Sequence, residues 1–597
     1  MTDTGPPRPA LALTLGITGH RAIDPDDRDR LSAQLDMVFT RVKASLAIVA
    51  AANLQVFAPE TPQLILISPL AEGADQIAAE VALGHGFALH ALLPFSRAVY
   101  LGDFIGAARE RYEALLARAD AVWAPPEQPD PEPGLITING YLLAGRATVA
   151  QSDILVALWD GDSARGQGGT TDIIDDAVRR GVPVVHLPTV DGQEPAILWA
   201  GFDDFAPELI SRDDAPRRPL EGPALEALVA ALVTPPAPPA ELEAFLHERQ
   251  RRRRTRTEWM LFLALVGVQA LKRDSFRIAP YAQSAQRDWE RYRVGTGDAS
   301  AQTSVPALET AFAWADGLAQ HYANVFRSGV VLNFAGSALA IVLALVAIGQ
   351  PGWKLPLVLV ELLLITLVIT NTVYGTRWQW HRRWLSYRYL AEQLRLLRSL
   401  KLIGAGSVAL RVRRGDQRWT DWYARSLWRG LGSPPDLAGA KSLAAQSRHI
   451  AAHELDGQVE YHQATAHRMH ELDHRLHRLG LGLFVSTIVI GMVVLAGLLT
   501  SLTAIKAMTP VLSVLSAILP TVGAAIFGIR GAGDFAGTAG RSAETARRLK
   551  HVAALLRRDE IVQASATRAV EEAAAIMLAD LAEWRSTYTH RKLAIPS

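Results

Sequence analysis

The chain has 597 residues, a net charge of +1 and no cysteine. This length exceeds what one hydrophobic core supports, so several domains are expected, and the near-zero net charge argues against a chain that attracts nucleic acid. The absence of cysteine excludes disulfides and thiolate-based metal or nucleophile sites. The first residues, MTDTGPPRPALALTLG, have no basic segment before the apolar run, so no secretory signal is expected.

Residues 11–187 alternate between short apolar runs and longer helical patterns. Strands are predicted at 11–18, 63–68, 87–93, 121–125, 153–159 and 182–187, and helices between them, for example at 26–50, 71–85 and 170–180. This order is typical of a doubly wound α/β domain, in which a parallel sheet carries helices on both faces. Ligands bind such sheets beyond the carboxyl ends of the strands, so a site is expected in the strand-to-helix loops.

Three of these loops, in GITGHR, SPLAEGAD and GQGGTTDII, combine glycines with polar side chains. The candidate ligand-binding residues are Gly16, Thr18, Gly19, His20, Arg21, Ser68, Glu72, Gly73, Asp75, Gly168, Gly169, Thr170 and Thr171. Arg21 can hold a phosphate through two hydrogen bonds, and the helix beginning near Thr170 favours an anion at its first amides. Glycine at one such turn is often turn chemistry alone, and His20 also fits a structural histidine. Three such loops at one sheet edge favour a phosphate site.

The segment that follows links this domain to a different kind of sequence. Residues 233–245, VTPPAPPAELEAF, are predicted to be a stiff linker. The basic run 249–256 fits either an anchor on acidic lipid headgroups or a solvated helix face. The apolar run 259–271 is too short to span a bilayer, and we expect it to pack in a helical layer.

Four apolar runs in the second half, 329–349, 355–375, 479–500 and 507–529, have the length of transmembrane helices. Short connections predict two hairpins. The segment between the hairpins is rich in Arg and His, which places it and both termini on the cytoplasmic side. The expected architecture is therefore an α/β domain followed by an all-α membrane region with four transmembrane helices in two hairpins and long cytoplasmic helices.

The predicted domains are a ligand-binding domain, a linker with a helical layer, a first membrane hairpin, a cytoplasmic helical connection and a second hairpin. Their boundaries are 1–235, 236–305, 306–400, 401–478 and 479–597.

Two further features of this half invite a functional interpretation. Glu361 lies inside an apolar run, where it fits either a pore-lining carboxylate or a protonated, hydrogen-bonded group near the membrane edge. A histidine-rich helical segment fits a polar helix face better than a metal site, because no open-site motif accompanies it. Its histidines are His449, His453, His462, His467, His470, His474 and His477.

The first 190 residues or so resemble the SLOG superfamily, Rossmann-like domains related to cytokinin-activating phosphoribohydrolases and to DprA. The matching segments are GITGHR, SPLAEGAD and GGTTD followed by a helix and GVPVVHL. The resemblance implies that this domain binds a nucleotide-derived signal, such as a cyclic oligonucleotide or an ADP-ribose derivative.

The membrane half, with its paired spans, WADGLAQHYANVFRSG and YRYLAEQLRLLRSL, resembles the SLATT family of membrane effectors. That resemblance implies a homo-oligomeric bacterial inner-membrane protein that forms a pore or breaches the bilayer in antiphage defence. The signal would come from a nucleotidyltransferase or a TIR-type enzyme, without direct contact with nucleic acid.

One departure from the hydrolase branch of SLOG bears on catalysis. That branch has a glutamate three positions after the threonine of its glycine-rich motif, where this chain has Ile173; Asp172 and Asp175 lie nearby out of register. Because glycosidic cleavage requires a placed carboxylate, no catalytic residue is assigned and sensing is favoured over cleavage. A membrane-tethered N-glycosidase and a regulated transporter remain alternatives, although no P-loop for ATP-driven transport is present.

Overall fold

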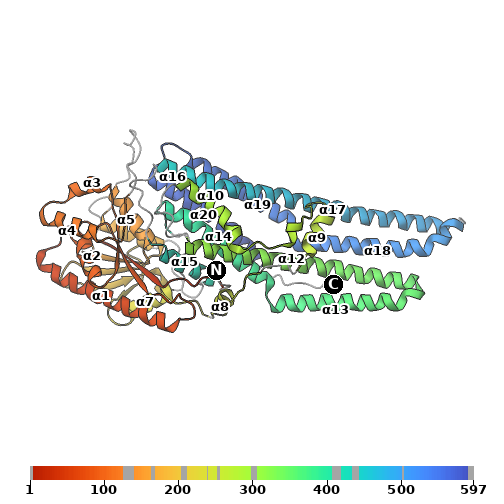
Figure 1. Ribbon diagram of the computed structural model, residues 1–597, viewed down its shortest axis with the longest axis horizontal. Helices are drawn as coiled ribbons and strands as arrows, with labels where there is room; N and C mark the ends of the chain where they lie inside the picture. Colours follow the sequence, from red (N-terminus) through yellow and green to blue (C-terminus); the bar gives the residue numbers. More distant parts are fainter. Residues whose placement is uncertain are drawn as a thin grey trace.

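The structure is a computed structural model that describes residues 5–124, 140–162, 169–203, 211–237, 239–251, 256–296, 306–406, 418–432, 443–500 and 503–588. The molecule is elongated, with a sheet domain at one end and long apolar helices at the other (Figure 1). Further helices lie between these two ends.

The N-terminal domain is built on a sheet with the strand order β4-β3-β2-β1-β5-β6-β7-β8. Its strands are β1 (Ala12–Gly19), β2 (Gln63–Ser68), β3 (Ala88–Leu92), β4 (Ala121–Trp123), β5 (Ile154–Trp159), β6 (Val184–Pro188), β7 (Ala196–Leu198) and β8 (Arg217–Pro219). The strands β1 to β6 pair in parallel, which confirms the predicted parallel sheet. The short strands β7 and β8 add antiparallel pairs at one edge and were not predicted.

Helices cover both faces of this sheet, as a doubly wound fold requires. On one face lie α1 (Pro25–Ala52), α2 (Ala74–Gly84) and α7 (Ala224–Val233), and on the other lie α5 (Gly140–Gln151) and α6 (Thr170–Arg180). The short helices α3 (Arg97–Tyr100) and α4 (Gly106–Ala117) follow β3. The period of the buried side chains in α1, for example Leu31, Leu35 and Val38, turns one apolar face onto the strands.

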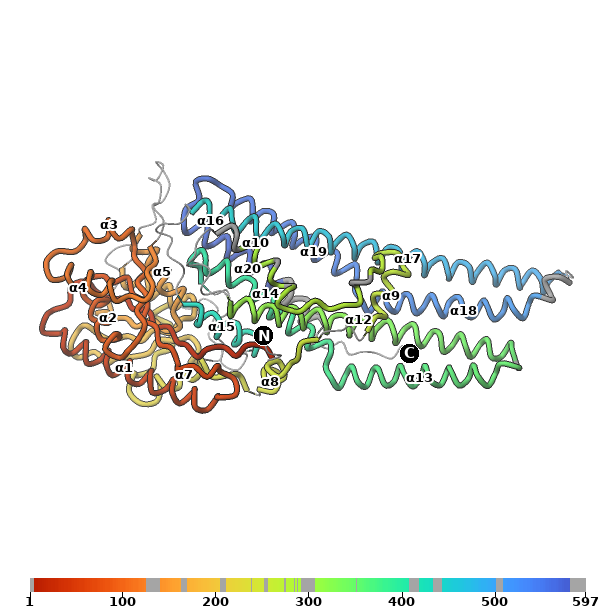
Figure 2. Tube along the Cα trace, viewed as in Figure 1, coloured from red at the N-terminus to blue at the C-terminus, as the bar shows by residue number. Residues whose placement is uncertain are grey.

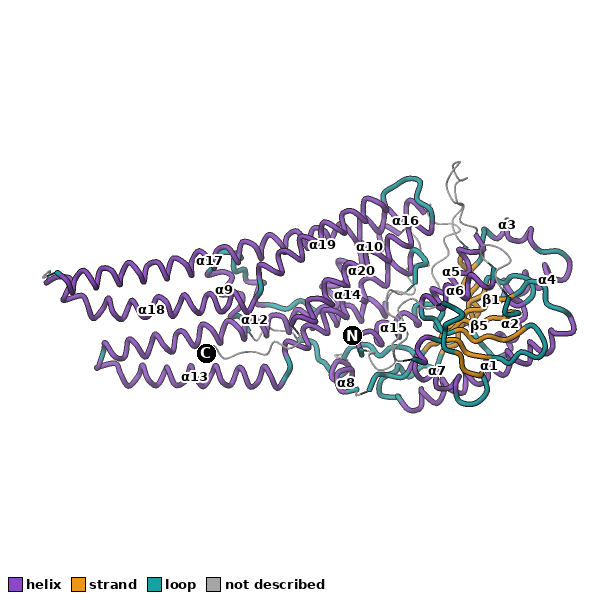
Figure 3. The backbone as a smooth tube through the Cα atoms, turned by 180° about the vertical axis from the view of Figure 1, so that it is seen from behind, coloured by secondary structure: helices purple, strands orange, loops and turns teal. Residues whose placement is uncertain are grey.

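The rest of the chain is helical (Figure 3). Its helices are α8 (Ala240–Leu246), α9 (Glu258–Leu265), α10 (Tyr281–Thr296), α12 (Pro306–Gly349), α13 (Lys354–Arg377), α14 (Trp380–Leu402), α15 (Trp419–Gly430), α16 (Leu443–Ile450), α17 (Asp456–Leu499), α18 (Thr503–Gly533), α19 (Phe535–Leu556) and α20 (Gln563–Tyr588). We call α8, α10, α14, α15, α16, α19 and α20, with the first halves of α12 and α17, the helical layer.

Among the described residues, four helical segments are long and apolar enough to cross a membrane. They contain the four predicted spans, which fall in α12, α13, α17 and α18. In the structure α12 packs along α13 and α17 packs along α18, and these pairs extend away from the sheet domain (Figure 2). Their outer surfaces carry exposed large apolar side chains, such as Leu363 and Ile488. An apolar surface of this extent is typical of a helix that faces lipid.

The proline-rich segment 233–245 was predicted to be a stiff linker, and this prediction is wrong for its last residues, which form α8. The described prolines Pro235, Pro236 and Pro239 are half-buried or exposed. Leu242 and Phe245 of α8 are fully buried. The Phe245 ring packs against the rings of Trp419 and Tyr423 in α15. Burial of these two apolar residues outweighs the stiffness that the prolines suggest, so the segment joins a core instead of separating two.

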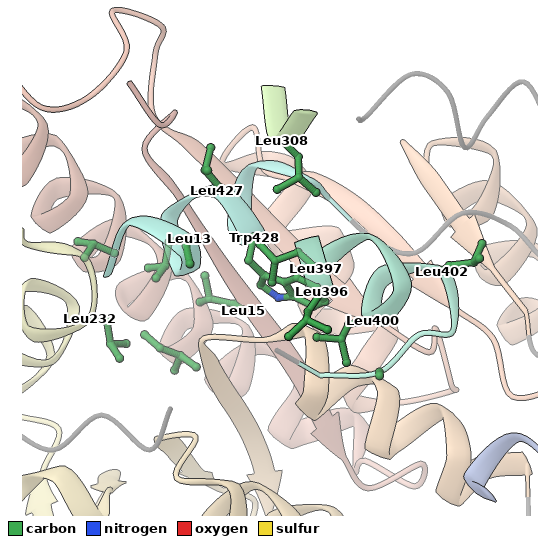
Figure 4. Close-up of a cluster of buried hydrophobic side chains, with 14 of the residues drawn as sticks. Leu13, Leu15, Leu232, Leu308, Leu396, Leu397, Leu400, Leu402, Leu427 and Trp428 are labelled. Carbon is green, nitrogen blue, oxygen red and sulfur yellow. The ribbon is translucent and has the colours of Figure 1, made fainter. Parts of the chain in front are cut away.

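The sheet domain and the helical layer share one hydrophobic core. Leu13 and Leu15 of β1 lie close to Leu427 and Trp428 of α15, with leucines of α14 next to them (Figure 4). The sheet therefore docks on the helical layer through the amino ends of its central strands.

A buried polar network reinforces this docking. The carboxylate of Asp153, just before β5, accepts hydrogen bonds from the Thr14 amide at 3.1 Å and from Arg429 Nε at 2.9 Å. Burial opposes ionisation of Asp153, but the charges of Arg429 and Arg425 hold its pKa below the usual range. A buried pair with both partners present fixes the orientation of the sheet on α15.

Candidate functional site

A pocket opens at the carboxyl ends of β1 and β5, where the strand order reverses. This is the position at which doubly wound sheets bind ligands. Its volume is about 350 Å³, within the range of small-molecule sites. The predicted residues that line it are Thr18, Gly19, His20, Arg21, Asp75, Gly169, Thr170 and Thr171. The sheet thus brings parts of all three predicted loops together.

Other predicted residues support the pocket without lining it. A Cβ atom on Gly16 would lie 2.3 Å from Ser152 Oγ, so this glycine lets α5 approach β1. Gly73 has a φ of +84°, and a Cβ there would lie 2.2 Å from the carbonyl oxygen of Arg21. These glycines serve close backbone packing, and Gly73 holds the second loop against the first.

The remaining predicted residues of the set contribute nothing to the pocket wall. Ser68 is fully buried, and its Oγ accepts a hydrogen bond from the Leu70 amide. Glu72 is exposed. Gly168 lies outside the described residues.

His20 and Arg21 follow β1 and face different partners. His20 Nε2 accepts a hydrogen bond from the Asp160 amide at 3.2 Å and lies 3.1 Å from Asp160 Oδ1, which ties the loop after β1 to the loop after β5. The guanidinium carbon of Arg21 lies 4.6 Å from the centre of the Tyr141 ring. Its Nη2 is 3.8 Å from Asp103 Oδ2, a loose contact that leaves most of its donors for a ligand.

Asp75 is the carboxylate that lines the pocket. Its side chain is buried, and Oδ2 accepts a hydrogen bond from the Ala71 amide at 3.2 Å. Burial raises the pKa of Asp75 to about 7, although the Ala71 amide and the Arg21 charge oppose the shift. Near neutral pH this acid is therefore partly protonated and presents less negative charge to an anion.

The first turn of α6 forms the opposite wall. Gly169 is the N-cap of this helix, so the amides that follow lack partners within the helix and the helix dipole favours an anion there. Thr171 donates a hydrogen bond to the Asp162 carbonyl at 3.0 Å. Ile173 packs tightly on Gly145 of α5, where a Cβ would lie 2.2 Å from Ile173 Cδ1. The two helices therefore hold the pocket wall as one unit.

Sequence reasoning missed the aromatic side of the pocket. Tyr100 and Tyr141 line it, together with Pro69, Pro94 and Ala144. Tyr141 lies in the first turn of α5, and Tyr100 is the last residue of the short helix α3 after β3. Neither stands in a recognisable motif, because only the strand order brings these segments next to β1.

The carboxylates considered for glycosidic cleavage do not line the pocket. Thr170, Thr171 and Ile173 of α6 line it, whereas Asp172 and Asp175 do not. Asp175 lies 3.8 Å from Arg212, and Asp176 pairs with Arg180 at 2.8 Å. Asp75 is the carboxylate of the described wall, and it comes from the first turn of α2.

The membrane-side candidates stand apart from this pocket. Glu361 is half-buried on α13. The imidazole rings of His449 and His453 lie 4.5 Å apart. Across the described ranges, no group of three or more His, Asp or Glu residues is arranged to hold a metal ion.

Comparisons with known proteins add no family assignment to this geometry. No protein-family model matches the chain, and a sequence comparison with curated proteins gives no match.

Proposed function

We propose that the chain is a membrane effector whose N-terminal domain senses a nucleotide-derived signal and whose apolar helices form two transmembrane hairpins that open a conduit. In this proposal the sheet domain and the helical layer are cytoplasmic. The resemblances to SLOG and SLATT proteins point to the same function, in bacterial antiphage defence.

The observation that carries the proposal is that two helices reach from the pocket to the helical layer. At the amino end of α5, Tyr141 and Gly145 line the pocket. At its carboxyl end, Gln151 donates a hydrogen bond to the Ala405 carbonyl at 2.7 Å and accepts one from Lys401 Nζ at 2.6 Å. Lys401 belongs to α14, which follows the apolar helix α13 in the chain.

The helix α6 repeats this arrangement. Thr170 and Thr171 line the pocket, and at the other end Arg180 Nη1 lies 3.5 Å from Glu571 Oε1 of α20. The helix α20 packs on α14 and on α19, which continues from α18. Suppose that α5 and α6 can adopt two arrangements relative to the helical layer. A ligand that binds one arrangement more tightly would then shift the equilibrium between two conformations of the helices that enter the membrane.

The pocket itself fits a phosphate-bearing ligand. Arg21 offers guanidinium donors, the first turn of α6 offers backbone amides, and Tyr141 offers an aromatic face. Arginine and a helix N-terminus are the donors that bind phosphate most often, and an aromatic ring can stack on a base.

The test uses the full chain reconstituted in vesicles loaded with a self-quenched dye. Cyclic oligonucleotides, ADP-ribose derivatives and nucleoside monophosphates are added in turn, while thermal unfolding is followed in detergent. A ligand at about 100 times its Kd adds about 2.7 kcal/mol to stability. We expect one compound to raise the unfolding temperature, to release the dye and to be recovered intact.

The variant Arg21→Ala should weaken binding of that compound and reduce leakage in parallel. Arg118→Ala is the matched control, because Arg118 is an exposed arginine at the end of α4 and does not line the pocket. Binding without any dye release, at saturating ligand, would refute the conduit and leave only a ligand-binding membrane protein.

One observation favours a second candidate function, hydrolysis of a nucleotide N-glycosidic bond. A carboxylic acid with a pKa of about 7 is suited to protonate a leaving group, and Asp75 is such a group in the pocket wall. Consumption of the bound compound, abolished in Asp75→Asn, would support this function over sensing.

A further inference from the structure

A second cavity lies within the helical layer, next to the apolar helices. It has a volume of about 490 Å³ and is enclosed by α9, α12, α14, α17, α19 and α20. It is distinct from the pocket in the sheet domain, with which it shares no lining residue. Four arginines line it, Arg327, Arg388, Arg468 and Arg541.

The position of this cavity follows from α9. Trp259 and Leu263 of α9 pack into an apolar cluster with Val331, Leu476 and Ile529 from α12, α17 and α18. The Trp259 amide donates a hydrogen bond to Ser328 Oγ at 3.1 Å. The helix α9 thus lines the cavity beside the start of the apolar run at 329–349. In Figure 3 this helix lies between α12 and α17. In the structure α9 packs on α12, α17 and α18, and the assignment of 259–271 to a cytoplasmic helical layer stays a prediction.

Arg327 is a cation without an anionic partner. Its guanidinium carbon lies 4.9 Å from the Trp384 ring centre and 5.6 Å from that of Trp259. Within the described part of the chain, no carboxylate lies within ion-pair distance of Arg327 and no group accepts a hydrogen bond from it. Burial and the neighbouring charges of Arg468 and Arg388 lower its pKa. Arg327 is half-buried and lines the cavity, where a bound anion would neutralise its charge.

The other three arginines differ in how far their charges are already neutralised. Arg388 lies 2.5 Å from Glu392 and 3.3 Å from Asp316, and Arg541 lies 3.2 Å from Asp534. Arg468 is exposed and donates only long hydrogen bonds, to the Ala464 carbonyl at 3.3 Å and to Thr465 Oγ1 at 3.5 Å. Arg327 and Arg468 therefore provide the unneutralised positive charge of the cavity.

The cavity also presents an unused polar group. Nδ1 of His462 is buried and has no hydrogen-bond partner among the described residues. Burial lowers the pKa of His462 to about 4, so the imidazole is neutral and its Nδ1 is available to a ligand hydroxyl or amide. Buried polar atoms in proteins nearly always have a hydrogen-bond partner, so Nδ1 of His462 is a contact point for a ligand.

We infer that this cavity binds a phosphate-bearing anion. Arg327 and Arg468 would hold the phosphate, and His462 would contact the group attached to it. The same chemistry belongs to the headgroup of an anionic phospholipid that enters from the bilayer and to a free phosphate compound. Arginine matches both, because its planar guanidinium pairs with two phosphate oxygens at once.

The experiment measures binding to the full chain in a neutral detergent with two probes. One probe is short-chain phosphatidylglycerol, with short-chain phosphatidylcholine as its reference, and the other is inorganic pyrophosphate. We expect one anionic probe to bind, and Arg327→Gln to weaken that binding about tenfold or more, as loss of a charge-assisted hydrogen bond predicts. A response to phosphatidylglycerol but not pyrophosphate assigns the lipid, and the reverse assigns a soluble ligand.

Two further variants test whether a loss of binding comes from the cavity. Arg468→Gln lies on an exposed part of α17, so it should fold normally and weaken the same probe. Arg547→Gln is the matched control, because Arg547 is an exposed arginine of α19 that pairs only with Glu544 and does not line the cavity. Equal binding of both probes to the wild type, Arg327→Gln and Arg468→Gln, or binding of neither probe to the wild type, would overturn the inference. Arg21→Ala should leave this binding unchanged, so the result is independent of the N-terminal pocket.

Discussion

At the scale of single residues, Asp75 gives the N-terminal pocket a pH dependence. Its pKa of about 7 lies above that of an exposed aspartate, so the proton is retained below neutral pH and lost as the pH rises through about 7. Loss of this proton adds a negative charge to the wall of the proposed anion site. The other ionisable groups nearby are His20, Arg21, Tyr100 and Asp103.

We predict that affinity for a phosphodiester ligand falls as the pH rises from 6 to 8, and that Asp75→Asn removes much of this fall. A phosphodiester is the proper probe because its charge is constant over this range. Isothermal titration at several pH values measures the effect. An unchanged pH profile in Asp75→Asn would show that Asp75 does not set this dependence.

Burial also shifts the pKa of Lys401. Its ammonium group is buried between Gln151 and the Trp428 ring, and burial lowers its pKa to about 7 despite the charge of Asp153. The unfolded chain keeps the proton up to about pH 10, whereas the folded chain releases it near 7. Between these values the unfolded state binds more protons, so folding stability rises with pH.

The corresponding prediction concerns Lys401→Met. Below pH 7 this substitution should raise the free energy of unfolding, because a buried charge is removed. The advantage over the wild type should shrink between pH 7 and 9, by at most about 1.4 kcal/mol per pH unit. Thermal unfolding at several pH values tests it, with exposed Lys43→Met as the control. A constant difference across the range would show that Lys401 titrates normally.

At the scale of elements, α6 connects the pocket to α20 through a single ion pair. Arg180 also pairs with Asp176 inside α6, so removing the charge of Glu571 leaves Arg180 with a partner. A partly exposed pair contributes about 1 kcal/mol or less, so stability should change little. The pair matters instead because it joins an element of the site to an element of the helical layer.

We therefore predict that Glu571→Gln keeps ligand affinity but reduces ligand-dependent dye release. The matched control is Glu572→Gln, since Glu572 is the next residue, is exposed and has no ion pair among the described residues. Affinity comes from titration and release from the loaded vesicles. Full release in Glu571→Gln would mean that α5 alone carries the coupling.

At the scale of the whole molecule, the shared core joins the sheet domain directly to the helical layer, without a flexible tether between them. Leu13 and Leu15 of β1 are buried with Leu427 and Trp428 of α15, and Asp153 is paired with Arg429 across the same boundary. Packed interfaces of this kind move as units, so a change at the pocket reaches the helical layer without a flexible linker.

The sequence by itself determined the local architecture. The periods of its apolar residues located strands β1 to β6, the helices between them and the four long apolar helices, because period and length depend on local geometry. It also located Arg21, Asp75 and Thr170 at strand-to-helix loops, which a parallel sheet must place at one edge.

Only the tertiary structure decided the contacts between segments distant in sequence. It placed Tyr141 beside Arg21, packed Phe245 of α8 against α15, added β7 and β8, and gathered arginines from separate helices around one cavity. These features depend on which elements become neighbours in the fold, and a local sequence pattern does not predict which distant elements will pack together. The physical reason is that burial and charge are properties of the packed neighbourhood, whereas periodicity is a property of the chain.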